Sequence, residues 1–179
     1  MSAGRSRRAW GWHPLRDEWA AQIVAQAQIR PGQLVLDIGA GRGALTRHLV
    51  AAGARVIAVE LHPDRVEYLR TRFAGESVTV VCTDAATLRL PRRPFRVLAS
   101  PPYAIGSAVL RRLLAPGTAL VAADLVLARP VVNRYAAGEA PGAGRWLRSF
   151  RVYRGSAVPR RAFAPPPQVD SAVLVVRRR

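Results

Sequence analysis

The sequence predicts an α/β fold built on a mostly parallel, seven-stranded sheet with helices on both faces. Short apolar and β-branched runs alternate with segments whose apolar residues recur at helical spacing, and this order produces parallel strands. The strand runs are apolar throughout, as expected for strands that are buried on both faces. The length of 179 residues allows one compact domain.

The first half of the chain contains the first three strands. Apolar residues at Trp19, Ile23 and Ala27 predict a helix from Arg16 to Ile29. Strands are predicted over residues 33–38, 55–59 and 78–82, and helices over 45–53 and 63–73 lie between them. Pro63 suits the first turn of the second of these helices, where its missing N–H costs nothing.

The second half begins with the same alternation and ends differently. A strand over 95–99, a helix over 105–114, a strand over 118–123 and a helix over 125–137 follow in order. Pro130 weakens or kinks the last of these helices. Residues 138–144 predict a glycine-rich loop. Strands over 147–153 and 171–176 then predict an antiparallel pair at one edge of the sheet.

The charge of the chain indicates a polyanionic partner. It has 28 basic and 11 acidic side chains, a net charge of +17, and every basic residue is arginine. Arginine grips phosphate bidentately and stacks on bases, which lysine does not do. Nucleic acid is therefore expected before an anionic membrane as the partner.

The remaining composition excludes several classes. The single cysteine, Cys82, excludes an intramolecular disulfide, and no cluster of histidines and cysteines indicates a metal site. No apolar run approaches the roughly 18 residues of a membrane span. The basic N-terminus has no apolar segment behind it, so it does not read as a signal peptide. A cytoplasmic protein, monomeric and without a bound metal, is expected.

A glycine-rich turn after the first strand is the first candidate binding element. Asp37, Gly39 and Gly41 lie between the predicted strand and helix, where backbone N–H groups can approach a ligand. Glu60 stands at the end of the second strand and Asp84 follows the third, placed to accept from ribose hydroxyls and from an adenine amine. The glycine spacing alone also fits a dinucleotide loop. Asp37 favours a cationic ligand instead, such as S-adenosylmethionine, because a carboxylate there would repel pyrophosphate.

The segment Ser100-Pro101-Pro102-Tyr103 is the second candidate element and follows the fourth strand. The two prolines fix the backbone and leave carbonyl acceptors beside a hydroxyl and an aromatic face. This set suits a flipped base whose amine donates to Ser100 and a proline carbonyl while its ring stacks on Tyr103. Acceptors around the amine would aim its lone pair at a methyl donor, so catalysis would rest on positioning and electrostatics.

Together these residues resemble the erythromycin-resistance 23S rRNA adenine N6-methyltransferases, within the rRNA adenine dimethylase superfamily. The resemblance covers nearly the whole chain, from Gly11-Trp12-His13-Pro14-Leu15 through the glycine loop and Tyr103. Its most specific part is residues 159–173, PRRAFAPPPQVDSAV, which is similar to a stretch that other methyltransferases lack. It implies a Rossmann-like class I S-adenosylmethionine-dependent fold.

The resemblance also implies residue roles. His13 and Leu15 would contact the cofactor together with Asp37, Gly39, Gly41, Glu60, Asp84 and Ser100. The target base would lie among Ser100, Pro101, Pro102 and Tyr103, with Phe163 stacked on its other face. The expected activity is methyl transfer to N6 of an adenine in 23S rRNA near the peptidyl transferase centre, which gives macrolide–lincosamide–streptogramin B resistance. The partner would be 23S rRNA or a large-subunit assembly intermediate.

This sequence departs from the family pattern at three places. Ser100 stands where the family usually has Asn, and Ser-Pro-Pro-Tyr also resembles cytosine-N4 DNA methyltransferases. Trp12 and Pro14 replace a Gln and a Phe. A single catalytic domain is expected over residues 1–179, with 1–15 as a basic arm and cofactor-lining segment. The family's C-terminal helical domain is not expected after Arg179.

The arginines near both ends are therefore expected to hold RNA phosphate. Nine arginines and one acid lie between residues 145 and 179. The residues expected to bind RNA are Arg5, Arg7, Arg8, Arg145, Arg148, Arg160 and Arg161. Two alternatives stay open. One is a cytosine-N4 or adenine-N6 DNA methyltransferase; the other is a catalytically inactive RNA-binding or ribosome-assembly protein on the same fold.

Overall fold

A computed structural model describes residues 12–179 and contains one seven-stranded sheet. The strand order is β3-β2-β1-β4-β5-β7-β6. The strands are β1 (Leu34–Ile38), β2 (Arg55–Glu60), β3 (Val78–Cys82), β4 (Phe95–Ala99), β5 (Leu120–Ala128), β6 (Phe150–Val158) and β7 (Ser171–Arg178). The first five are parallel, and β7 is antiparallel to both β5 and β6. The predicted fold class, including the antiparallel C-terminal pair, is confirmed.

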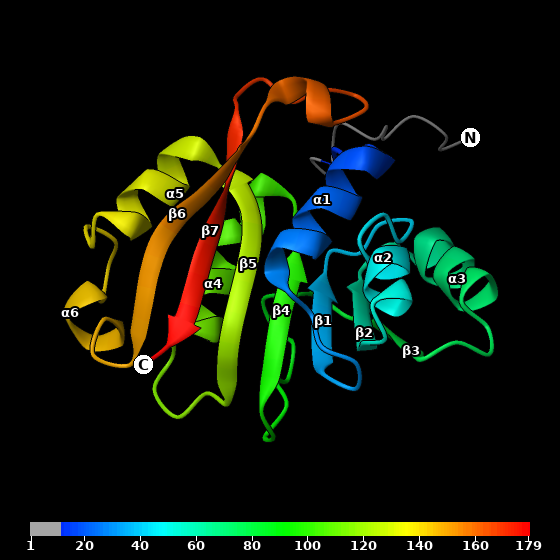
Figure 1. Ribbon diagram of the computed structural model, residues 1–179, viewed down its shortest axis with the longest axis horizontal. Helices are drawn as coiled ribbons and strands as arrows, with labels where there is room; N and C mark the ends of the chain where they lie inside the picture. Colours follow the sequence, from blue (N-terminus) through cyan, green and yellow to red (C-terminus); the bar gives the residue numbers. More distant parts are fainter. Residues whose placement is uncertain (1–11) are drawn as a thin grey trace.

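Helices cover both faces of this sheet (Figure 1). The helices are α1 (Asp17–Ala27), α2 (Thr46–Ala51), α3 (Pro63–Arg72), α4 (Gly106–Leu113), α5 (Arg129–Ala136) and α6 (Ala143–Trp146). Short 3-10 helices follow β4 (η2, Tyr103–Ile105) and β6 (η3, Arg160–Ala162). Residues of α1 and α2 pack in one hydrophobic core with β1 and β2, while α4, α5 and α6 pack in the other. Strands β1 and β4 are buried on both sides, as their apolar sequences predict.

The strand β5 is longer than the sequence predicts. The predicted helix over 125–137 was wrong in its first part, because Leu125, Val126 and Leu127 continue β5 and pair with β7. These three residues are at most 1% exposed and pair with β7, so burial within the sheet decides their conformation. The helix α5 begins at Arg129, and Pro130 lies in its first turn, where it causes no kink.

The segment after α5 also differs from its prediction. The short helix α6 lies partly within the predicted loop, and β6 begins at Phe150 instead of residue 147. The strand β6 then continues to Val158, well past its predicted end. The carboxyl ends of the parallel strands and η3 lie at one end of the sheet, and α6 lies at the opposite end (Figure 1). No helix within residues 12–179 is long and apolar enough to cross a membrane.

Candidate active site

The glycine loop lies at the carboxyl end of β1 and bends against the segment that follows β4. Gly39 and Gly41 have φ of +77° and +60°, which glycine adopts without strain. The N–H groups of Gly39 and Ala40 donate to the Val59 carbonyl. A Cβ on Gly39 would lie only 3.2 Å from the Pro101 Cα and 3.1 Å from the Pro102 Cδ. The two predicted site segments are therefore in contact.

Glu60 ends β2 beside this loop, and its carboxylate fixes the loop in place. It is 6% exposed and accepts from the Gly41 N–H at 2.8 Å. Its other oxygen accepts from the N–H groups of Leu61 and His62, each at 2.9 Å. An ionised carboxylate has about four acceptor positions, so these three bonds leave one for a ribose hydroxyl.

Asp84 and Glu60 lie at the wall of one cavity of about 270 Å³, the adenosine cavity, which is lined mainly by apolar groups. Val59, Leu61 and Ile105 contribute apolar side chains to it. One oxygen of the exposed Asp84 accepts from the Ala86 N–H at 2.8 Å, and no hydrogen bond within the described chain uses its other oxygen. Two acids beside apolar walls fit the ribose, the exocyclic amine and the faces of an adenosine.

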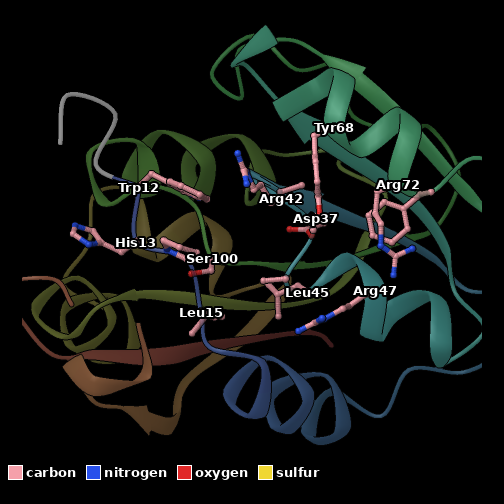
Figure 2. A pocket seen from close by; sticks show the side chains of 16 residues that line it. Trp12, His13, Leu15, Asp37, Arg42, Leu45, Arg47, Tyr68, Arg72 and Ser100 are labelled. Carbon is pink, nitrogen blue, oxygen red and sulfur yellow. The ribbon is translucent and has the colours of Figure 1, made fainter. Parts of the chain in front are cut away.

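Asp37 lines the adjoining cavity, of about 210 Å³, together with Gly39 and Ser100. Its carboxyl group is 1% exposed and accepts from the Thr46 hydroxyl at 2.7 Å. Figure 2 shows Asp37 among the lining residues, with Ser100 on one side of it and Tyr68 on the other. Burial, with a smaller contribution from nearby Glu60, raises the pKa of Asp37 to about 7. A cationic ligand beside it would favour the ionised carboxylate.

This raised pKa leads us to expect pH-dependent cofactor binding. Between pH 4 and 7 the folded protein holds a proton on Asp37 that the unfolded chain has lost, so stability falls as pH rises through this range. Binding of a cation displaces that proton, so affinity should rise with pH and level off above 7. With a pKa of about 7, affinity at pH 6 should be roughly tenfold below its plateau. Calorimetry in buffers of different ionisation enthalpy measures the released proton.

Asp37→Asn supplies the control for that measurement. The variant keeps an acceptor for Thr46 and removes the titrating group, so its affinity should not change between pH 6 and 8. The same pH dependence in Asp37→Asn would mean that a different group titrates.

The segment after β4 presents the acceptors that the sequence predicts. The Pro102 carbonyl accepts from the Ile105 N–H at 3.0 Å as η2 begins. The Pro101 carbonyl and the half-buried Ser100 hydroxyl make no hydrogen bond to the described residues. The structure thus leaves Ser100 Oγ and the Pro101 carbonyl available to a base amine.

Tyr103 is held by the C-terminal stretch that carries the most specific resemblance. Its hydroxyl is hydrogen-bonded to the hydroxyl of Ser171, and burial raises the pKa of Tyr103 above its usual value. The stacked rings of Tyr103 and His13 have centroids 6.1 Å apart. The ring of His13 therefore lies against Tyr103, where the target base was expected to stack.

The N-terminal segment and the C-terminal stretch are bonded to each other beneath this site. Leu15 pairs with Phe163 in an isolated antiparallel bridge, and the Ala164 N–H donates to the Pro14 carbonyl at 3.1 Å. His13 Nδ1 lies 3.0 Å from the Pro165 carbonyl oxygen. Two segments about 150 residues apart thus build one wall, which explains why the resemblance includes both.

The space predicted for the target base is small in this structure. Ser100, Tyr103 and Phe163 line a cavity of only about 10 Å³, near the minimum that holds one water. Phe163 lines this cavity and is only 1% exposed. A base can enter only if side chains around this cavity move, and stacking on Phe163 stays a prediction.

Trp12 takes a part in the site that the sequence analysis did not assign. It lines both cofactor cavities, and its indole Nε1 lies 2.7 Å from where a Cβ on Gly41 would be. The Arg65 guanidinium stacks on its ring at 4.1 Å and lies 3.8 Å from Glu60. Trp12 thus covers the glycine loop where the family usually has a smaller Gln. The resemblance places Trp12 in the cofactor-lining segment but gives it no role of its own.

The predicted RNA-binding arginines do not lie along one path. Arg160 and Arg161 belong to η3, at the same end of the sheet as the site, while Arg145 lies on α6 and Arg148 just beyond it, at the opposite end (Figure 1). Arg177 binds buried Asp124 at 2.8 Å instead of facing a ligand. Arg5, Arg7 and Arg8 lie outside the described residues.

Fold and site together define a class I S-adenosylmethionine-dependent methyltransferase. The profile of the ribosomal RNA adenine dimethylase family matches residues 5–179, and the chain belongs to this family. Its cofactor is S-adenosylmethionine. The residues of the two cavities fit that cofactor, since Asp37 offers a carboxyl group for its cationic part and Glu60 and Asp84 suit the adenosine.

Relatives and solved structures agree with this membership. The chain is 39% identical to "Ribosomal RNA small subunit methyltransferase A" of Thermosynechococcus vestitus, over 97% of this chain and 70% of that protein. It is 35% identical to "rRNA adenine N-6-methyltransferase" of Saccharopolyspora erythraea, over 98% of this chain and 47% of that protein. The crystal structure of the 23S rRNA methyltransferase ErmE is similar with a TM-score of 0.83 and 32% identity, over 92% of this chain and 69% of that one. The chain thus spans about half to 70% of the length of these relatives.

Proposed function

We propose that this protein transfers a methyl group from S-adenosylmethionine to N6 of an adenine in ribosomal RNA. The observation that carries the proposal is the pair of free acceptors, Ser100 Oγ and the Pro101 carbonyl, beside Tyr103 and next to the glycine loop. Family membership supports the same chemistry. A dinucleotide, which the glycine spacing alone would also allow, fits less well, because its pyrophosphate would lie beside the buried carboxyl of Asp37.

The protein's own groups would act by holding and orienting the base. The amine of the base would donate to Ser100 Oγ and the Pro101 carbonyl, which draws its lone pair out of conjugation with the ring. Tyr103 would stack on the base, and its bond to Ser171 would hold the phenol ring in position. The cofactor supplies the electrophilic methyl group. No general base is needed, because the amine loses its proton after the attack, and the rate gain comes from positioning and electrostatics.

We further propose 23S rRNA, at an adenine near the peptidyl transferase centre, as the target. Methylation there would give macrolide–lincosamide–streptogramin B resistance. The similarity to ErmE and to the Saccharopolyspora erythraea enzyme supports this target. The small-subunit rRNA is the second candidate, because relatives with that name are up to 39% identical. That residues 1–179 form a single domain also stays a prediction.

A methyl-transfer assay with labelled cofactor tests these proposals. Naked 23S rRNA, naked small-subunit rRNA, assembled large subunits and duplex DNA would be offered, and the modified base mapped by primer extension. Label on a 23S adenine near the drug-binding region supports the first target, and label on a small-subunit adenine supports the second. Label on DNA would support the DNA alternative. Cofactor binding without label on any substrate would favour the inactive RNA-binding alternative.

Tyr103→Ala is expected to reduce this transfer strongly. Stacking of a base on an aromatic ring contributes about 1–3 kcal/mol, so kcat/KM should fall roughly 5- to 150-fold. Tyr153→Ala is the matched control, because Tyr153 is a 49% exposed tyrosine on β6 that lines none of the site cavities. Equal activities in the two variants would contradict the assignment of Tyr103 to the base.

A further inference from the structure

Two adjoining hollows extend from Ala86, next to the adenosine cavity, toward the opposite end of the sheet. The first, of about 680 Å³, is lined by the β3–β4 connection and α4. The second, of about 330 Å³, is lined by α6, the start of β6 and Arg178. Both are bordered by the connection between α4 and β5, which lies at the same end of the sheet as α6 (Figure 1). Because they share Ala115 to Thr118, we treat them as one surface and call it the basal groove.

The basal groove is lined by arginines that have no partner of their own. The side chains of Arg92, Arg111, Arg145 and Arg148 are exposed and form no hydrogen bond or ion pair with residues 12–179. No acidic residue lines either hollow. Like charges gathered without counter-charges raise the local positive potential, which an anion would lower.

Other arginines make the walls of the groove rigid. Arg112 donates to the Leu88 carbonyl, which ties α4 to the β3–β4 connection. Arg178 donates to the carbonyls of Leu120 at 2.7 Å and Thr118 at 2.5 Å, and its guanidinium lies 4.8 Å from the Phe150 ring. The groove is therefore a preformed surface with free charged groups on fixed walls.

We propose that the basal groove binds the phosphodiester backbone of the RNA substrate, as a second contact remote from the methyl-transfer site. This inference rests on the proposed function for the identity of the RNA. Strand β5 has nine residues and spans roughly 30 Å between the two ends of the sheet. An RNA that contacts both the methyl-transfer site and the basal groove must therefore be a structured fragment. A short single strand could fill the site but would not reach the groove.

A phospholipid surface fits this groove less well. Surfaces that bind bilayers combine basic residues with exposed apolar anchors. The large exposed apolar residues of the described chain are Leu61, Tyr68, Tyr153 and Val169, and none of them lines the groove. The two hollows are also concave. A phosphodiester backbone can enter them, whereas a flat bilayer would contact only the residues at their rims.

Two double variants of the groove test the proposal. Arg92→Gln with Arg111→Gln and Arg145→Gln with Arg148→Gln each remove two charges from exposed positions. Arg70→Gln with Arg154→Gln is the matched control, because both residues are exposed and line none of the cavities. Filter binding to naked 23S and small-subunit rRNA transcripts would be measured over a range of salt concentrations. A short single-stranded oligonucleotide containing one adenine serves as the probe for the site alone.

Each groove variant is expected to weaken transcript binding and to flatten its salt dependence. Losing two phosphate contacts should reduce the slope of log affinity against log salt by about 1.4 to 1.8. Binding of the short oligonucleotide and of S-adenosylmethionine should stay unchanged, which also establishes that the variants are folded. The control variant should keep the wild-type slope.

Two results would overturn the proposal. One is an equal salt slope for the groove and control variants. The other is unchanged transcript binding together with lost binding to phosphatidylglycerol vesicles. The proposed function is tested by a different measurement, because it fails if the wild-type protein transfers no methyl group. The salt dependence of RNA binding is measured without methyl transfer, so the two failures can be told apart.

Discussion

Gly39→Ala is expected to reduce S-adenosylmethionine affinity roughly 100-fold, a loss of about 2.7 kcal/mol in binding free energy. Gly39 has φ of +77°, where an L-residue is strained by about 1–2 kcal/mol. The added methyl would also meet the Pro101 Cα at 3.2 Å and the Pro102 Cδ at 3.1 Å. Proline backbone cannot yield as a flexible side chain does, so the loop and the base-binding segment must separate. Calorimetric titration of the cofactor measures the loss, and methyl transfer should fall with it.

Gly75→Ala is the control for a strained alanine placed outside the site. Gly75 has nearly the same φ, +79°, but a Cβ there would meet nothing within 4 Å. The control therefore carries the conformational strain without the contact to the prolines. Its cofactor affinity should equal that of the wild type. If both variants bind the cofactor normally, the contact of Gly39 with Pro101 does not shape the site.

The sequence could predict where the site lies because its signals are local. Glycine after a strand and an acid at the next strand end are read from short segments, and parallel strands bring them to one edge. Asp37, Glu60 and Asp84 are found there. The family resemblance supplied the N-terminal and C-terminal segments as well. Their roles in holding cofactor and base stay predictions.

The sequence could not predict contacts that depend on tertiary pairing. The bond of Tyr103 to Ser171 and that of His13 to Pro165 join residues 68 and 152 positions apart. No local pattern specifies such a pair. The residues from Leu125 to Leu127 fit a helix or a buried strand equally by apolar content, and only the neighbouring strands decide.

The sequence also could not predict that one arginine, Arg96, is buried in the sheet. Arg96, on β4, reads as one charge among 28 basic side chains. In the structure it is 9% exposed and donates to the carbonyls of Ala27 and Gln28, where α1 ends. The last turn of α1 has no basic residue of its own, so Arg96 supplies the positive charge that favours a helix C-terminus. Most of the net positive charge indicates a polyanionic partner, but the charge of Arg96 stabilises the fold.

Asp124→Ala is expected to destabilise the protein by about 3–5 kcal/mol, because it leaves buried positive charge uncompensated. Asp124 is 5% exposed on β5, with Arg177 at 2.8 Å and Arg96 at 3.5 Å. Burial lowers the pKa of Arg96, and the nearby carboxylate opposes that effect. Without Asp124, both arginines must keep their charge in a poorly solvated position. Urea unfolding followed by circular dichroism measures the change in the free energy of unfolding.

Two further variants decide whether uncompensated charge is the cause. Glu76→Ala removes an exposed partner of Arg72, just beyond the end of α3, and should cost at most about 1 kcal/mol, as exposed surface pairs do. Asp124→Leu combined with Arg96→Met removes a buried charge of each sign, so it should lose less stability than Asp124→Ala alone. Some loss should remain, because the carbonyls of Ala27 and Gln28 then lack their donor. A double variant less stable than Asp124→Ala would show that the hydrogen bonds of Arg96, and not the unpaired charge, set the cost.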